Sequence, residues 1–274
     1  MWNSLFALMA LVFLVGCATP ELTSVRPRGL DVFVSGGKAR DRSLGEETVH
    51  GSLWQVGATR RSKMRSGLNP PMNLDDTHAL GLCTETFTIY LQCVETMQDD
   101  DSGEPGIEYR MVNRFIKNMD ILEHMNPERP IIISMKTGGG DLCEGLAIYD
   151  TIKSAPNPTT ILSYTQASSM SSIVLQAANK RVLMPSSHVM LHEGSISWGG
   201  TLKQARSDFE FAKWGDELCM CIYIQALKGS KKFGKWGEER VRRHLQDLFD
   251  TKEEVYHTAE EAIESGLADE IYEN

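Results

Sequence analysis

One feature constrains the fold of this chain more than any other, a strand–turn–helix unit that recurs in the middle of the sequence. Apolar runs at 130–135 and 159–164 have the length of buried strands, and each is followed by small or polar residues and then by a helical pattern. Two shorter apolar runs, at 181–184 and 189–192, follow with Pro185 in the turn between them. Strands that alternate with helices predict an α/β fold with a largely parallel sheet.

Weaker patterns extend this repeat in both directions, so we expect one folded domain from residue 81 to residue 274. A region of this length can bury a large core. The acidic stretch 98–106 and the Lys/Gly-rich stretch 229–237 are expected to be loops. The remaining expected elements are a strand at 84–94 and helices at 107–123, 202–227, 238–249 and 259–266.

The N-terminus has the pattern of a processing segment. Residues 5–16 are an almost unbroken apolar run, too short to span a bilayer but of the length found in signal-peptide cores. The run ends in LVGC at Cys17, which resembles the lipobox of bacterial lipoproteins. We therefore expect 1–17 to be a signal peptide, and Cys17 to be lipidated and to anchor the chain at the cell envelope. The alternative is an apolar N-terminal segment on a cytoplasmic protein, because residues 1–4 lack the Lys or Arg with which signal peptides usually begin.

The segment 18–80 is rich in Pro, Gly, Ser and Arg and has weak apolar periodicity, so we expect an irregular basic arm. This arm is either a solvated tail or a contact site for anionic lipid or a partner, and the sequence leaves both interpretations open. The whole chain is acidic, with 28 basic against 37 acidic residues and a net charge of −9. This balance argues against a nucleic-acid binder.

Small and polar residues follow the strands of the repeat, at the edge where α/β proteins place their sites. The first loop holds Gly138, Gly139 and Gly140, which let the backbone approach a ligand and leave the next helix's first N–H groups to hold a phosphate or an oxyanion. Its spacing matches neither a P-loop nor a dinucleotide fingerprint. A tight structural turn is the alternative.

The next two loops offer a nucleophile and a base. Residues 166–172 (QASSMSS) begin a helix, where a serine can cap the helix or act as a nucleophile whose following N–H faces the substrate carbonyl. His192 ends an apolar strand, where it is either a structural histidine or a general base. Three consecutive units therefore offer an oxyanion cradle, a nucleophile and a base.

These residues also resemble a known family, the proteolytic subunits of Clp proteases, over 131–274. The matching segments, each with the family pattern it resembles, are 137–140 (TGGG, Ser-Pro-Gly-Gly), 145–151 (GLAIYDT, Gly-x-x-Ile-Tyr-Asp-Thr), 166–170 (QASSM, Gln-Ala-Ala-Ser-Met), 184–185 (MP, Leu-Pro), 190–192 (MLH, Met-Ile-His), and 261–263 with 266–269 (EAI and GLAD, Glu-Ala-x-x-Tyr-Gly-Leu-Val-Asp). The resemblance implies a ClpP/crotonase-like fold, a repeated β-β-α superhelix with a long protruding helix.

The resemblance also implies a serine endopeptidase without metal or organic cofactor. Ser169 attacks the peptide carbonyl, His192 takes and returns the proton, and Asp250, at the position of the family's catalytic Asp, fixes the histidine tautomer. The implied functional residues are the triad Ser169, His192 and Asp250 and the oxyanion donors Gly139, Gly140 and Met170. The implied assembly is a homo-oligomer of heptameric rings stacked as a tetradecamer, acting on peptides or unfolded proteins. A Clp-type ATPase unfoldase is a partner only if the chain is cytoplasmic, because ATP is absent beyond the membrane.

Three other functions compete with this reading. A membrane-associated peptidase of the signal-peptide-peptidase type shares the fold and suits the lipobox, but uses a Lys base. An acyl-CoA hydratase or isomerase of the crotonase fold uses the same oxyanion geometry without a serine nucleophile. A catalytically silent ring subunit is the third. The presence of Ser169, His192 and Asp250 together disfavours all three.

Overall fold

The computed structural model describes residues 77, 79–92, 106–195 and 197–273. The chain divides into two units, Met1–Pro70 and Pro71–Asn274, and every described residue belongs to the second. The expected signal peptide with Cys17, and nearly all of the expected basic arm, lie outside the described residues, so both remain predictions. Within the described ranges, no helix is both long and apolar enough to cross a membrane.

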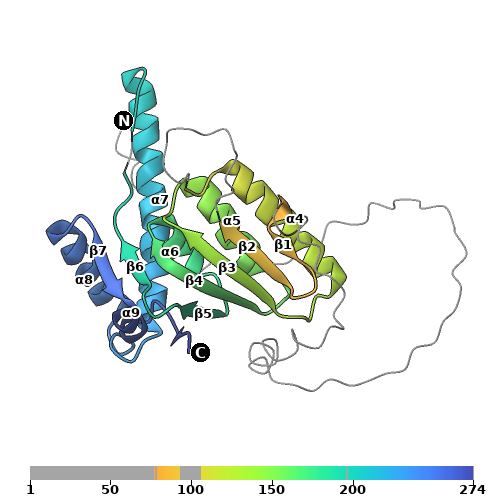
Figure 1. Ribbon diagram of the computed structural model, residues 1–274. Helices are drawn as coiled ribbons and strands as arrows, with labels where there is room; N and C mark the ends of the chain where they lie inside the picture. The colour runs from red at the N-terminus through yellow and green to blue at the C-terminus, as the bar shows by residue number, and fades with distance from the viewer. Residues whose placement is uncertain (1–76, 78, 93–105, 196, 274) are drawn as a thin grey trace, which may run out of the picture. The chain divides into compact units, whose positions relative to one another are not determined.

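An eight-stranded sheet organises the described part of the chain (Figure 1). Its main path runs β1-β2-β3-β4-β5-β8, with β6 beside β4 and β7 beside β6. All pairings are parallel except β1 with β2 and β6 with β7, which confirms the predicted α/β fold with a largely parallel sheet. The strands are β1 (Leu82–Cys83), β2 (Thr88–Gln92), β3 (Ile131–Thr137), β4 (Thr159–Ser168), β5 (Lys180–Leu183), β6 (His188–Leu191), β7 (Val255–Thr258) and β8 (Glu270–Ile271).

Strand β4 divides its partners between two neighbours. Its first half pairs with β5 through Ser163, and its last residues, from Gln166, pair with β6. Between these two stretches lies Thr165, whose φ of 64° is in the left-handed region that β-branched residues rarely occupy. Because β5 stops pairing at this point, the carboxyl end of β4 lies next to β6, and both strands can place residues in one site.

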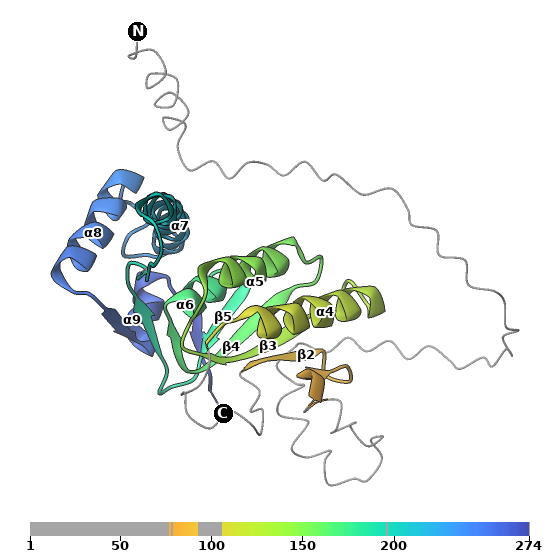
Figure 2. The same ribbon diagram turned by 90° about the horizontal axis from the view of Figure 1, so that it is seen from above.

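Helices α4 and α5 lie side by side on one face of the sheet (Figures 1 and 2). Asp141 caps the N-terminus of helix α5, where its carboxylate accepts a hydrogen bond from the Glu144 N–H at 3.0 Å and so satisfies one of the free donors of the first turn. Helix α7 protrudes beyond the sheet, as the resemblance implied (Figure 1). The helices are α4 (Tyr109–Met125), α5 (Leu142–Ser154), α6 (Met170–Leu175), α7 (Leu202–Lys228), α8 (Glu238–Thr251) and α9 (Ala259–Ser265).

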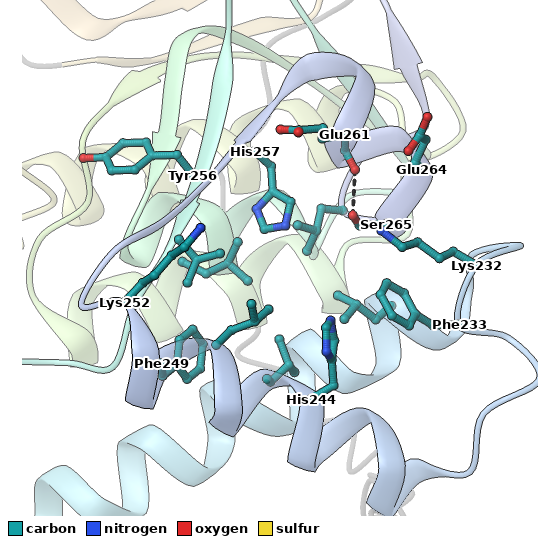
Figure 3. A pocket seen from close by; sticks show the side chains of 16 residues that line it. Lys232, Phe233, His244, Phe249, Lys252, Tyr256, His257, Glu261, Glu264 and Ser265 are labelled. Atoms are coloured by element: carbon teal, nitrogen blue, oxygen red, sulfur yellow. Dashed lines mark hydrogen bonds between the residues drawn. The ribbon is translucent and has the colours of Figure 1, made fainter.

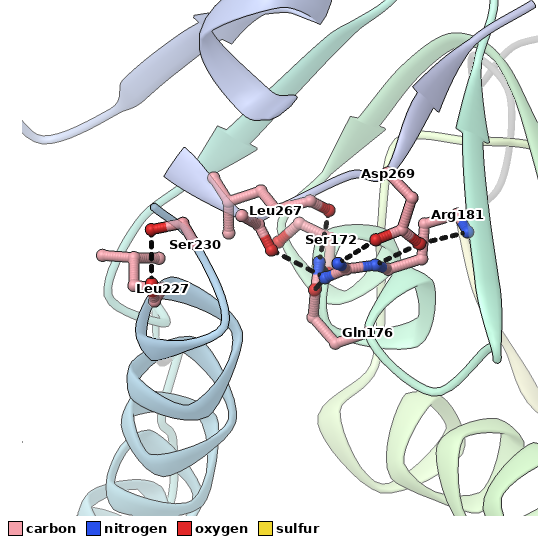
Figure 4. Close-up of polar contacts among 8 residues, drawn as sticks. Ser172, Gln176, Arg181, Leu227, Ser230, Leu267 and Asp269 are labelled. Carbon is pink, nitrogen blue, oxygen red and sulfur yellow. Dashed lines mark hydrogen bonds and ion pairs between the residues drawn. The ribbon is translucent and has the colours of Figure 1, made fainter. Parts of the chain in front are cut away.

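The C-terminal strand β8 is held by a polar network around the partly buried Arg181 (Figure 4). The Arg181 side chain donates from Nε to Asp269 Oδ2 at 3.0 Å and from Nη1 to the Gly266 carbonyl at 2.7 Å. Burial alone would raise the pKa of Asp269, but the hydrogen bonds and charge of Arg181 lower it. Arg181 Nη2 also donates to Asp269 Oδ1, and this bidentate pair fixes the chain direction just before β8, and thereby the position of β8 on the sheet.

Candidate active site

Ser169 occupies a strained turn between β4 and α6. Its backbone has φ 54° and ψ −130°, in a region that residues with side chains rarely adopt, while its N–H still donates to the Met190 carbonyl at 3.0 Å. Strain of this kind persists only where the surrounding structure imposes it, and it is common at reactive residues. The geometry is that of a strand-to-helix nucleophile turn.

His192 is brought to Ser169 by the parallel pairing of β4 and β6. The register places Ser168 opposite Met190, so the residues that follow both strands meet at the same edge. His192 Nε2 lies 2.7 Å from Ser169 Oγ, which is hydrogen-bond distance. For the hydroxyl to donate to Nε2, the neutral ring must carry its proton on Nδ1, the tautomer that a general base requires.

The glycine loop lies against this pair. Gly139 has φ 107°, and a Cβ placed on it would lie 2.6 Å from Ser169 Cβ and 3.0 Å from the Met170 nitrogen, so only glycine fits here. The Met170 N–H, in the first turn of α6, has no hydrogen-bond acceptor among the described residues. Gly140 has φ 151° and packs against Ile107, where a Cβ would collide with the backbone at 2.4 Å. Gly139 and Met170 therefore border the position that an oxyanion would occupy beside Ser169.

Asp250 is not joined to this pair. It is exposed at the end of α8, and its Oδ1 accepts a hydrogen bond from Gln246 Nε2 at 3.3 Å. The same Gln246 amide donates to Glu193 Oε1 at 2.9 Å. Across the described residues, no hydrogen bond or ion pair links Asp250 to His192.

A different carboxylate, Asp216 on α7, lies close enough to His192 to interact with its charge. Its Oδ1 accepts a hydrogen bond from the Gly194 N–H at 3.2 Å. Burial raises the pKa of Asp216, while the Gly194 hydrogen bond and the charge of His192 oppose that rise. Asp216 could not be singled out from the sequence, because nothing in a helical pattern indicates which helix residue will reach a distant loop.

The described part of the chain holds no group of three His, Cys, Asp or Glu side chains that could bind a metal ion.

A separate cavity of about 290 Å³ is bordered by α8, α9 and β7 (Figure 3). Neither Ser169 nor His192 lines it. Its walls carry the aromatic ring of Phe233 and the side chains of His244 and His257. This cavity is therefore distinct from the serine site.

His257, which lines this cavity, is expected to make the folded protein less stable at acid pH. Burial lowers the pKa of His257, which Lys232 and Lys252 lower further and Glu261 partly restores. Because the folded pKa lies below the unfolded value of about 6.5, the unfolded chain binds more protons as the pH falls through this range, and acid favours unfolding. We expect the loss in unfolding free energy between pH 7.5 and 5.5, measured by urea denaturation, to be smaller in His257→Gln than in the wild type.

The matched control for this prediction is His124, an exposed histidine on α4 whose pKa is raised by a hydrogen bond to the Asp120 carbonyl and by the Asp120 charge. Because the pKa of His124 is raised on folding, its protonation stabilises the folded state as the pH falls. His124→Gln should therefore lose as much unfolding free energy between pH 7.5 and 5.5 as the wild type, or more. An unchanged pH dependence in His257→Gln would show that this histidine does not titrate differently on folding.

A serine on a strained turn, hydrogen-bonded to a histidine and bordered by glycine, defines the site of a serine hydrolase. Comparison with known proteins gives the particular family. A family model described as Clp protease matches residues 103–274. The ATP-dependent Clp protease proteolytic subunit of Deinococcus radiodurans is 30% identical over 172 residues, which cover 62% of this chain and 77% of that protein. The chain belongs to the Clp protease family and is a serine-type peptidase.

Proposed function

We propose that this protein is an endopeptidase that hydrolyses peptides or unfolded proteins through a triad of Ser169, His192 and Asp250. The observation that carries the proposal is the 2.7 Å contact between His192 Nε2 and Ser169 Oγ. In the first step the hydroxyl oxygen bonds to the peptide carbonyl carbon as its proton passes to Nε2. The resulting imidazolium then returns that proton to the leaving amine, which breaks the peptide bond and leaves an acyl-enzyme for water to hydrolyse.

The oxyanion formed in that step needs donors aimed at it. We assign this role to the Met170 N–H and to an N–H of the Gly139–Gly140 pair, since Gly139 packs directly against Ser169 and Met170. One such donor typically contributes about 3 to 4 kcal/mol to transition-state stabilisation. No metal or organic cofactor has a role in these steps.

A fluorophosphonate probe tests the proposal directly, since it forms a covalent bond only with an activated serine hydroxyl. We expect labelling of the wild-type protein, mapped by peptide mass spectrometry to Ser169. The neighbouring serines 168, 171 and 172 serve as internal controls in the same peptide. Label on any of these, or none on Ser169, would refute the nucleophile assignment.

The site also bears on the competing functions. His192 Nε2 occupies the position beside Ser169 Oγ that a lysine ammonium would need in a Ser–Lys peptidase. A crotonase-type hydratase has no use for a serine hydroxyl polarised by histidine. Both alternatives therefore lack a supporting observation at this site.

We propose that the protein works as a homo-oligomer, with heptameric rings stacked through α7. Large apolar side chains are exposed on this protruding helix. Single exposed apolar residues are common, but a contiguous apolar surface marks an interface. Phe211 and Trp214 stack with ring centroids 5.4 Å apart. The exposed residues and their exposed fractions are Leu202 (75%), Phe209 (53%), Phe211 (48%) and Trp214 (52%). Native mass spectrometry should find fourteen chains per particle, and a monomer would refute the proposal.

We further propose that Cys17 carries a lipid that anchors the protein at the cell envelope. The LVGC sequence supports this, and a peptidase beyond the membrane would work without an ATPase unfoldase, on short or unfolded chains. Mass spectrometry of the mature N-terminus decides the matter. An acylated Cys17 fits the envelope location, whereas an intact Met1 would favour the cytoplasm and leave an unfoldase partner open.

A further inference from the structure

Behind the nucleophile lies a chain of two buried hydroxyl groups. Ser172, in α6, is fully buried, and its Oγ lies 2.6 Å from the Ser169 carbonyl oxygen and 2.7 Å from Tyr223 Oη. Tyr223 belongs to α7 and is only 2% exposed. The two residues are 51 positions apart in the sequence, so only the packing of α7 against α6 joins them.

The direction of donation along this chain follows from the atoms. The Ser169 carbonyl has no hydrogen, so the Ser172 hydroxyl must donate its single proton to it. Tyr223 is then the donor to Ser172, and the order is Tyr223 to Ser172 to the Ser169 carbonyl. Burial raises the pKa of Tyr223, so its hydroxyl keeps its proton across the working pH range. Serial hydrogen bonds in a buried setting strengthen one another.

The accepting carbonyl shares a peptide plane with the proposed oxyanion donor. The Ser169 C=O and the Met170 N–H belong to one trans peptide unit, in which they point in opposite directions. Holding the carbonyl therefore fixes the direction of the N–H. The Ser172 N–H also donates to this carbonyl, at 2.9 Å, but that bond is common to any residue in the first turn of a helix. The hydrogen bond from the Ser172 hydroxyl is a second contact that holds the Ser169–Met170 peptide plane, which begins at the strained residue Ser169.

We propose that Tyr223 and Ser172 are positioning residues that aim the Met170 N–H at the oxyanion. The inference rests on the proposed role of Ser169 as the nucleophile. In Tyr223→Phe the Met170 N–H remains and the Ser172 hydroxyl can still donate to the Ser169 carbonyl, but Ser172 loses the hydrogen bond that holds it. Removing the Tyr223 hydroxyl should therefore weaken catalysis less than deleting an oxyanion donor, which typically lowers kcat by 10² to 10³-fold. We expect a decrease of about tenfold for Tyr223→Phe, and a larger one for Ser172→Ala, which removes the direct donor.

The test compares Tyr223→Phe with Ser171→Ala. Ser171 is a matched control, since it is buried in the same helix turn but its Oγ has no hydrogen-bond partner among the described residues. For Tyr223→Phe we expect kcat for a fluorogenic peptide to fall about tenfold, with KM within twofold and the pH profile unchanged in shape. Affinity for a peptide aldehyde, whose adduct places an oxygen at the oxyanion position, should fall by the same factor. Ser171→Ala should leave all four quantities close to wild type.

The double variant Ser172→Ala with Tyr223→Phe should be no slower than Ser172→Ala alone, because Tyr223 acts through Ser172. All rates are taken per site titrated with fluorophosphonate, so a loss of folded protein does not count as a loss of kcat. The inference is wrong if Tyr223→Phe equals the wild type, if its loss lies in KM alone, or if Ser171→Ala is equally impaired. If the wild type is not labelled at Ser169, the proposed function fails first and this inference fails with it.

Discussion

Replacing Ser169 by Ala will lower kcat for peptide hydrolysis by about 10⁵-fold, and His192→Ala will lower it by a similar factor. The two side chains are 2.7 Å apart and act as one unit, because the hydroxyl is a weak nucleophile unless the imidazole takes its proton as the carbon–oxygen bond forms. The double variant should therefore be no slower than either single variant. The measurement is the rate on the fluorogenic peptide that the wild type hydrolyses fastest, at fixed protein concentration.

Ser168→Ala is the control for this prediction. Ser168 is the preceding residue and is 4% exposed, so its replacement alters the same turn without touching the pair. The family resemblance itself places an Ala at this position. We expect Ser168→Ala to retain activity within about threefold, as befits a serine outside the reacting groups. If the decrease in kcat of the Ser169 and His192 double variant equals the product of the two single decreases, the residues act independently, which would exclude a nucleophile–base pair.

The placement of Ser169 and His192 could be predicted because it follows from topology alone. Carboxyl ends of parallel strands meet at one edge of a sheet, so the residues after β4 and β6 had to lie close together. The glycine loop after β3 was identified for the same reason, and φ of 107° at Gly139 explains why that residue is glycine.

Other features of the fold and site depend on packing between distant segments. Strands β7 and β8 have four and two residues, too few for an alternating pattern to emerge. Strand β4 continues past the predicted end at 164 because its residues from Gln166 pair with β6, beyond a positive φ at Thr165 that no propensity indicates. The contacts of Asp216 and Tyr223 are set by how α7 lies against the sheet, and helical periodicity shows which face is apolar but not what that face meets.

Replacing Asp250 by Asn will lower kcat by about 10⁴-fold, whereas Asp216→Asn will lower it less than about threefold. In the proposed triad a carboxylate must accept the Nδ1 proton of His192, and an amide in its place favours the wrong tautomer. Asp250 comes from the family resemblance, and Gln246 links its helix end to Glu193, directly after His192. Asp216 instead has Oδ1 engaged by the Gly194 N–H, a bond that orients the loop and does not require proton transfer.

The two variants make the same change of charge, and both lie near the histidine loop, so a general electrostatic effect would alter them equally. Rates measured from pH 6 to 9 separate the cases, because loss of the carboxylate that orients the histidine lowers kcat at every pH in one variant only. A large decrease in kcat for Asp216→Asn with a small one for Asp250→Asn would show that the third triad residue is Asp216 on α7 and not Asp250 on α8. The contact of Asp216 with the His192 loop would then be the functional one, and the end of α8 would serve only to hold Glu193 through Gln246.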